Sequence, residues 1–131
     1  MIKSKSFYTL LLTGGTGTFG EEFLKVILKD KKLKKVIIFS RDEMKQWHMK
    51  KKYLDKRIRF FIGDIRDENR LMMALKDVDY VFHAAAMKIV ETAEYNPFEC
   101  IQTNVVGAMN LVKASIHNKV KKVIALSTSK Y

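Results

Sequence analysis

Apolar residues fall into two alternating patterns along this chain. Short continuous runs, rich in strand-forming residues, are typical of strands buried on both faces of a parallel sheet. Between them, apolar residues recur every three or four positions, which is typical of helices with one buried face. The runs predict strands at residues 7–12, 36–39, 58–62, 80–83 and 123–126.

Helices are expected in the intervals, at residues 19–29, 42–54, 67–76 and 97–118. The last has the clearest start, because Asn96 can cap it, Pro97 suits its first position and Glu99 completes a capping box. Strands that alternate with helices of this length imply right-handed crossovers. The pattern therefore predicts an α/β fold, a Rossmann-type doubly wound parallel sheet of about five strands.

Composition limits the chain to one domain and excludes some partners. A chain of 131 residues that is 47% hydrophobic can bury one core, so a single domain spanning residues 1–131 is expected. The single cysteine, Cys100, cannot form an intramolecular disulfide, and no run reaches transmembrane length. We therefore expect a cytoplasmic protein without a membrane partner.

The formal net charge of +11 is compatible with a nucleic acid or with a phosphorylated ligand. The basic clusters at residues 29–35 and 45–59 lack the interleaved aromatic residues of a stacking platform for single strands. No nucleic-acid-binding motif is recognised either. A nucleic acid is therefore not an expected partner, and no metal-ligand cluster is expected.

The most informative motif follows the first strand and reads Thr13-Gly14-Gly15-Thr16-Gly17-Thr18-Phe19-Gly20. Glycine allows a tight turn and a close approach of the backbone to a pyrophosphate, whose charge the following helix N-terminus attracts. A plain strand-to-helix turn is the alternative. The position between a strand and a helix favours a dinucleotide site.

The end of the second strand indicates which dinucleotide is bound. Proteins that bind NAD usually carry Asp or Glu there, about 20 residues after the glycines. This chain has Ser40 and Arg41 at that place, with Lys45 nearby. A guanidinium, an ammonium and a hydroxyl suit a 2′-phosphate, so NADP is predicted. In the alternative, both bases are ordinary exposed residues and Asp42 serves NAD.

Two further strand ends carry candidate contacts. After the third strand, Asp64 could accept a hydrogen bond from the adenine amino group, with a plain turn as the alternative. After the fourth strand, the small residues Ala84 and Ala85 would let the backbone approach the cofactor, and Lys88 could contact ribose or a sugar nucleotide. His83 is expected to be a core residue rather than a catalyst.

Taken together, these motifs resemble the extended short-chain dehydrogenase/reductases, and more narrowly the inverting UDP-N-acetylglucosamine 4,6-dehydratases. The resemblance spans essentially the whole chain and is carried by residues 13–20, 40–43, 63–67, 84–88 and 94–97. It implies that residues 16–19 hold the pyrophosphate, 40–45 the adenosine phosphate, and 64–65 the adenine. The predicted cofactor-binding set is Thr13, Gly14, Thr16, Gly17, Thr18, Phe19, Gly20, Ser40, Arg41, Asp42, Glu43, Lys45, Asp64, Ile65, Ala84, Ala85, Lys88 and Asn104.

The resemblance also implies a reaction and a substrate. Such enzymes oxidise C4 of a UDP-N-acetylglucosamine-like sugar nucleotide by hydride transfer to NADP. They then eliminate water across C5 and C6 and return the hydride to C6 with inversion at C5. This chemistry belongs to nucleotide-sugar, surface polysaccharide or flagellin glycan biosynthesis. A sugar-nucleotide epimerase or reductase of the same fold and a nonenzymatic NADP-binding module stay open as alternatives.

The sequence departs from the family pattern near its end. The catalytic Thr-Asp-Lys of the family reads Thr128-Ser129-Lys130, so Lys130 matches while a serine, a poor general acid, replaces the carboxylate. The Tyr-x-x-x-Lys pair and the substrate part are missing. We expect an incomplete enzyme, inactive alone, with one sheet face uncovered and an exposed sheet edge that favours homo-oligomers or other association.

Overall fold

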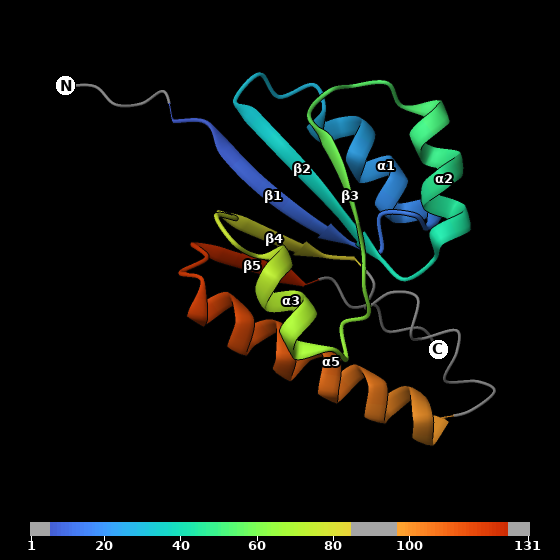
Figure 1. Ribbon diagram of the computed structural model, residues 1–131, viewed down its shortest axis with the longest axis vertical. Coiled ribbons are helices and arrows are strands. Elements are labelled where there is room, and N and C mark those ends of the chain that lie inside the picture. The colour runs from blue at the N-terminus through green and yellow to red at the C-terminus, as the bar shows by residue number, and fades with distance from the viewer. Residues whose placement is uncertain (1–5, 85–96, 126–131) are drawn as a thin grey trace.

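The computed structural model describes residues 6–84 and 97–125, with the side chains of residues 97–104 left out. The strands follow one another along the chain with helices between them, as Figure 1 shows. The strands are β1 (Tyr8–Thr13), β2 (Leu33–Ser40), β3 (Ile58–Ile62), β4 (Tyr80–His83) and β5 (Lys122–Ala125). The helices are α1 (Thr18–Ile27), α2 (Glu43–Lys52), α3 (Glu68–Ala74) and α5 (Pro97–His117).

All five strands join one parallel sheet in the order β3-β2-β1-β4-β5. The order reverses between β1 and β4, where crossovers to the two halves of the sheet diverge. In this register Thr13 pairs with Phe39 on one side and His83 on the other, so three carboxyl ends lie together. The predicted doubly wound fold is confirmed, and ligands of such sheets bind at this reversal.

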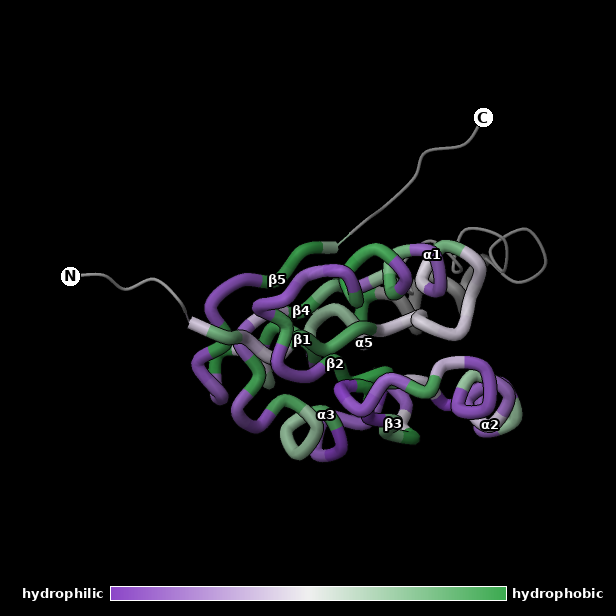
Figure 2. The backbone as a smooth tube through the Cα atoms, turned by 90° about the horizontal axis from the view of Figure 1, so that it is seen from above, coloured by the Kyte–Doolittle hydropathy of each residue, from purple (hydrophilic) through white to green (hydrophobic). Residues whose placement is uncertain are grey.

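Helices cover both faces of the sheet, and each face has its own apolar core. Successive strand residues point to opposite faces, so Leu12 packs with α1 and α2 while Leu11 packs with α3 and α5. Figure 2 shows the apolar strands inside and the strongly polar α2 outside. In the described residues α1 and α2 pack on one side and α3 and α5 on the other, so neither face is wholly uncovered, although β5 stays exposed.

The predicted strand boundaries agree with the structure for β3 and β4 and differ for β2. β3 and β4 span the predicted residues, whereas β2 begins at Leu33 rather than at Val36. Leu33 is buried and pairs with Tyr8, and Lys35 pairs with Thr9. The strand thus runs through two lysines at the amino edge of the sheet, where their charged ends reach water.

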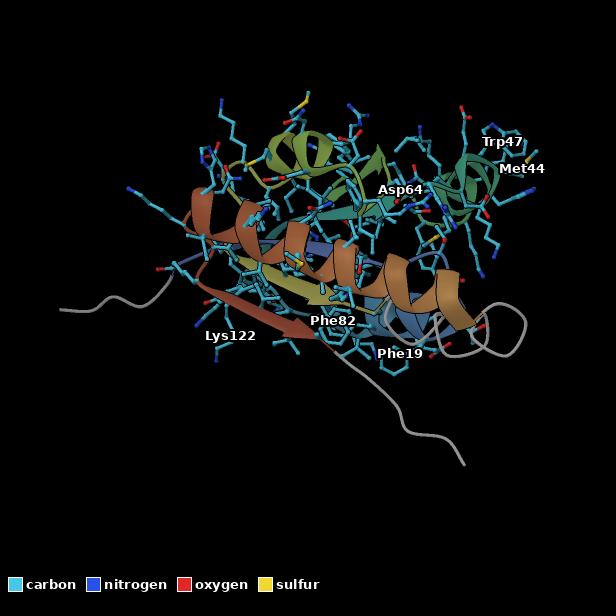
Figure 3. The ribbon with its side chains drawn as sticks, turned by 90° about the horizontal axis from the view of Figure 1, so that it is seen from below. Phe19, Met44, Trp47, Asp64, Phe82 and Lys122 are labelled. Carbon is cyan, nitrogen blue, oxygen red and sulfur yellow. The ribbon has the colours of Figure 1, made fainter. Side chains whose placement is uncertain are left out.

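The outermost described strand on one side is β5, which pairs with β4 in the described part of the chain. Its four residues are all exposed, with Val123 at 38% and Ile124 at 43%. Figure 3 shows Lys122 on this strand at the margin of the molecule. The exposed edge that the sequence predicted is present within the described residues, and association through it stays a prediction.

Candidate functional site

The glycine loop between β1 and α1 has a shape that side chains would disturb. Gly14 has φ 74°, in the left-handed region that favours glycine. The Gly17 N–H donates to Gly14 O at 3.1 Å and closes the turn. A Cβ added to Gly20 would collide with the backbone of Gly14, so the first turn of α1 packs directly against the loop.

The start of α1 differs from the starts of α2 and α3. Its N-cap residue is Gly17, and no side chain among the described residues caps this helix. By contrast, Asp42 Oδ1 accepts from Lys45 N at 3.0 Å at the start of α2, and Asp67 Oδ1 accepts from Arg70 N at 3.1 Å at the start of α3. The first backbone N–H groups of α1, at the positive end of its dipole, can therefore serve an anion.

Phe19 extends the loop toward β4. It is 43% exposed and stacks on Phe82, with ring centroids 6.4 Å apart. Phe23 also stacks on Phe82, with ring centroids 3.9 Å apart. Figure 3 shows Phe19 and Phe82 on the same side of the molecule. Thr18 is exposed beside it. The predicted pyrophosphate loop thus ends in an apolar wall over β4.

The turn after β2 presents polar groups next to the glycine loop. Ser40 Oγ accepts from Asp42 N at 2.9 Å, and the Asp42 carboxylate caps α2. Arg41, with a side chain 70% exposed, reaches toward Asp64, where Nη1 lies 3.4 Å from Oδ2. Lys45 and Glu43 are exposed on the first turn of α2. The structure therefore brings Ser40, Arg41 and Asp64 together.

Asp64 sits between two arginines at the end of β3. Its Oδ2 lies 2.9 Å from Arg66 Nη2 and its Oδ1 accepts from Arg66 N at 2.9 Å. These hydrogen bonds, more than the charge of Arg41, hold the pKa of the Asp64 carboxyl below its usual range. Figure 3 shows Asp64 near the ends of β2 and β3. It is an ionised acceptor, and its predicted role toward adenine stays a prediction.

The neighbouring Ile65 is placed by α5. Asn110 Nδ2 donates to Ile65 O at 3.0 Å, and a Cβ added to Gly107 would collide with the Ile65 side chain. The absence of a side chain at Gly107 therefore lets α5 approach Ile65 closely. Asn104 lies one turn earlier in α5, and its side chain is outside the described residues.

The point where the strand order reverses holds a buried polar pair. Thr13 Oγ1 lies 2.6 Å from His83 Nδ1, and His83 is 3% exposed. Burial lowers the pKa of His83, so its ring is neutral near pH 7, and its Nε2 has no hydrogen-bond partner among the residues that the structure describes. Ala84 is buried and its N–H donates to Thr13 O at 3.1 Å. His83 therefore occupies a core position.

Several predicted site residues cannot be placed. Ala85, Lys88, Ser129 and Lys130 lie outside the described residues, so their predicted roles stay predictions. Within the described part, the helices offer no apolar stretch long enough to cross a bilayer. The same residues contain no group of three His, Cys, Asp or Glu side chains placed to hold a metal.

Sequence reasoning missed three residues that shape the site. Arg66 holds Asp64, Asn110 holds Ile65, and Gln46 contacts the ends of β2 and β3. For Gln46 a signal existed, since it falls one turn before Met49 on the inner side of α2, where an apolar residue is expected. Asn110 acts on Ile65 through a tertiary contact that spacing alone does not reveal, whereas Arg66 acts through a local contact with Asp64 two residues before it.

The sequence matches the family of polysaccharide biosynthesis proteins over residues 10–131. A UDP-N-acetylglucosamine 4,6-dehydratase (inverting) of Campylobacter jejuni strain 81-176 is 55% identical over 121 residues, which are 92% of this chain and 36% of that protein. A UDP-glucose 4-epimerase of Rickettsia bellii strain OSU 85-389 is 53% identical over 125 residues, and the match covers 93% of this chain and 37% of that protein. The chain thus spans little more than a third of these relatives.

Solved structures show the same sheet. Pen from Bacillus thuringiensis is 47% identical with a TM-score of 0.83, covering 92% of this chain and 37% of that one. DesIV, a dTDP-glucose 4,6-dehydratase from Streptomyces venezuelae solved with NAD bound, is 26% identical with a TM-score of 0.77. The match covers 94% of this chain and 43% of that one. These similarities confirm the predicted resemblance to sugar-nucleotide 4,6-dehydratases. The chain belongs to the polysaccharide biosynthesis protein family.

Proposed function

We propose that this chain forms the NADP-binding part of an inverting UDP-N-acetylglucosamine 4,6-dehydratase. The observation that carries the proposal is the start of α1, where a glycine loop leads into a helix that no side chain of the described part of the chain caps. This helix end lies at the reversal of strand order, beside the turn that holds Ser40 and Arg41. An anionic dinucleotide fits such a place.

The described residues fit NADP in three parts. The N–H groups at the start of α1 would hold the pyrophosphate, and Asp64 with Ile65 would hold the adenine. Ser40, Arg41 and Lys45 would hold the 2′-phosphate. Asp42 supports this choice over NAD, because its carboxylate already caps α2 and would have to leave that cap to bind a ribose hydroxyl.

NADP, when bound, supplies the hydride acceptor and donor of the reaction. The part of the chain described here binds and orients the cofactor, and its apolar wall of Phe19 and Phe82 limits water on the β4 side. Lys130, at the family's catalytic lysine position, would act on a UDP-N-acetylglucosamine-like sugar. Turnover in this family depends on a Tyr-x-x-x-Lys pair that these 131 residues do not contain, so we expect them to be inactive on their own.

A second candidate is a UDP-sugar 4-epimerase. It is favoured by the 53% identity to a Rickettsia bellii protein named UDP-glucose 4-epimerase, almost as high as the 55% identity to the Campylobacter dehydratase. The two activities leave different products, a dehydrated 4-keto sugar or a sugar inverted at C4. Product analysis by NMR with a protein that joins this chain to the remainder of its relatives' length separates them.

Calorimetric titration of the chain with NADP and with NAD tests the cofactor proposal. We expect NADP to bind about 10- to 100-fold more tightly, since charge-assisted hydrogen bonds to the 2′-phosphate contribute about 1.5–3 kcal/mol. Arg41→Ala should remove most of this preference, whereas Lys56→Ala, which removes an exposed charge elsewhere, should not. Equal affinities for NAD and NADP in the unaltered chain would contradict NADP as the cofactor.

A further inference from the structure

Gln46 is a buried polar residue on the inner side of α2. It is 3% exposed, and it precedes the buried Met49 by one turn, so it stands where this helix would ordinarily carry an apolar side chain. Burial of an amide is costly unless hydrogen bonds replace those it made to water. The partners of Gln46 therefore indicate why a polar residue is present.

Those partners are backbone carbonyls at the ends of two adjacent strands. Gln46 Nε2 donates to Ser40 O at 3.1 Å and to Phe61 O at 3.2 Å, and Ile38 O lies 3.5 Å away. An amide nitrogen has two N–H donors, which match the two shorter contacts. Because these neighbours are all acceptors, the nitrogen rather than the oxygen of the amide faces them. Gln46 thus ties the last residue of β2 to β3.

The same turn is held by three more bonds. The Gly63 N–H also donates to Ser40 O, at 3.0 Å, and the Asp42 N–H donates to Ser40 Oγ at 2.9 Å. The backbone N–H of Gln46 donates to Asp42 O at 3.1 Å. Arg41 lies between Ser40 and Asp42, so the backbone on both sides of it is fixed. In Figure 1 the chain passes here from the end of β2 into α2.

The side chain of Arg41, by contrast, is weakly held. It is 70% exposed, and its ion pair with Asp64 has an N–O distance of 3.4 Å. An exposed pair of this kind contributes about 0–1 kcal/mol. The direction of the Arg41 guanidinium therefore depends mainly on the backbone of Ser40 and Arg41. Gln46 holds this backbone through its hydrogen bond to Ser40 O.

We propose that Gln46 is a positioning residue for recognition of the 2′-phosphate. It sets the backbone at the end of β2 so that the Ser40 hydroxyl and the Arg41 guanidinium meet the phosphate together, and it touches no part of the cofactor. This inference rests on the proposed NADP site. Loss of the amide would leave the carbonyls of Ser40 and Phe61 without this donor, and the turn would relax. NADP would then lose contacts that NAD does not make.

Titrations of the whole chain with NADP and with NAD test this role, in the unaltered chain and in Gln46→Met. Methionine keeps the length of glutamine but has no donor. Asn118→Leu is the matched control, because Asn118 is another amide that donates to two carbonyls, Met72 O at 3.2 Å and Ala114 O at 3.0 Å. Asn118 follows α5 at the amino edge of the sheet, away from the site.

The measured quantity is the ratio of the Kd for NAD to the Kd for NADP. An unfolded fraction weakens both affinities by the same factor, so the ratio is insensitive to a merely structural effect. We expect it to fall about tenfold in Gln46→Met, equivalent to losing about one hydrogen bond to the phosphate, and to stay unchanged in Asn118→Leu. If Gln46→Met does not fold, Gln46→Asn, which keeps the amide but shortens its reach, decides by the same ratio.

Three outcomes overturn the inference. An unchanged ratio in the folded Gln46 variant, together with a lost preference in Arg41→Ala, removes the role of Gln46 and leaves the NADP proposal standing. An equal fall of the ratio in Asn118→Leu would mean that the ratio also responds to an amide remote from this turn, and the fall in Gln46→Met would then assign no positioning role to Gln46. No preference for NADP in the unaltered chain contradicts the proposed cofactor, and the role of Gln46 is lost with it.

Discussion

The two ends of helix α1 differ in whether side chains bond their free backbone groups. At its N-terminus the cap is Gly17, which has no side chain to offer. At its C-terminus Arg57 reaches across from the start of β3, and Nη2 donates to Leu28 O at 2.6 Å while Nη1 donates to Asp30 O at 3.1 Å. Asp55 in turn holds this guanidinium at 2.7 Å. The protein closes one end of the helix, and no described side chain closes the other, where we propose that the cofactor binds.

This difference separates stability from binding within one element. Unpaired backbone groups at a helix end need partners, and where a side chain supplies them the end contributes to stability. Where glycines expose them beside a switch in strand order, the partner has to come from outside. Changes at the closed end should therefore affect unfolding, and changes at the open end should affect cofactor binding.

The largest effect is expected from Gly20→Ala, which tests how closely the open end packs on its loop. The added Cβ would collide with the backbone of Gly14, which has no flexible group that can move away. We expect a loss of about 3 kcal/mol or more in the free energy of unfolding, measured with urea. Gly17→Ala is the control, since its Cβ would meet Gly14 O at an ordinary 3.5 Å. Equal stability of the two variants would contradict the packing described here.

A second prediction converts the open end into a closed one. In Gly17→Asp the new carboxylate can cap α1, as Asp42 caps α2, but it also places a negative charge where the pyrophosphate would bind. We expect NADP affinity to fall about 100-fold while the free energy of unfolding stays within about 0.5 kcal/mol. Calorimetry and urea unfolding measure the two quantities.

Two controls separate charge from capping in that experiment. Gly17→Asn supplies a neutral cap and should weaken NADP binding less than the aspartate does. Asp67→Asn removes a charge at the start of α3 and should leave NADP affinity unchanged. Wild-type affinity in Gly17→Asp would mean that the anion does not bind at this helix end.

The closed end should show the reverse response in Arg57→Ala. The carbonyls of Leu28 and Asp30 would lose their charged donor, and the chain segment that joins α1 to β2 would lose its link to β3. We expect a loss of about 1.5–3 kcal/mol in the free energy of unfolding, with NADP affinity of the folded chain unchanged. Lys56→Ala, an exposed neighbour, should stay within about 0.5 kcal/mol. A change in affinity without a change in stability would reverse the assignment of the two ends.

The sequence predicts one end of this comparison and not the other. The glycine spacing after a strand predicts the open end directly, because glycine has few reasons to recur there. Arg57 lies in a lysine-rich stretch and looks like any exposed base. Its partners, Leu28 and Asp30, are far away in the sequence and meet it only when β3 pairs beside β2. Composition and spacing therefore do not predict the contact of Arg57 with these carbonyls.

In the fold, too, features set by local sequence are predicted and features set by tertiary contacts are not. Strands such as Ile58–Ile62 and Tyr80–His83 are predicted to the residue because short runs rich in strand-forming residues define them. The start of β2 at Leu33 is not, because pairing with Tyr8 overrides the lysines that follow. In the site, Ser40 and Arg41 follow from their position after a strand, whereas the buried role of Gln46 depends on carbonyls of two strands. Periodicity shows which face is buried, and only the tertiary structure shows why a polar residue is buried there.

The smallest effect is expected from pH at the closed end. The hydrogen bonds from Arg57 lower the pKa of Asp55 to about 2, from a usual value near 3.8. A carboxyl with a lowered folded-state pKa stabilises the fold above its unfolded-state pKa, and this stability is lost as the pH falls from about 4 to about 2. The Asp55 side chain is 29% exposed and water screens the pair, so we expect it to contribute about 1 kcal/mol or less to the free energy of unfolding.

Urea unfolding at pH 6 and pH 2.5 tests this prediction. Asp55→Asn should be less stable than the unaltered chain at pH 6, with most of that difference gone at pH 2.5. A difference for Asp55→Asn that does not depend on pH would mean that Asp55 acts through its shape and not through its charge, and that Arg57 closes α1 without its help.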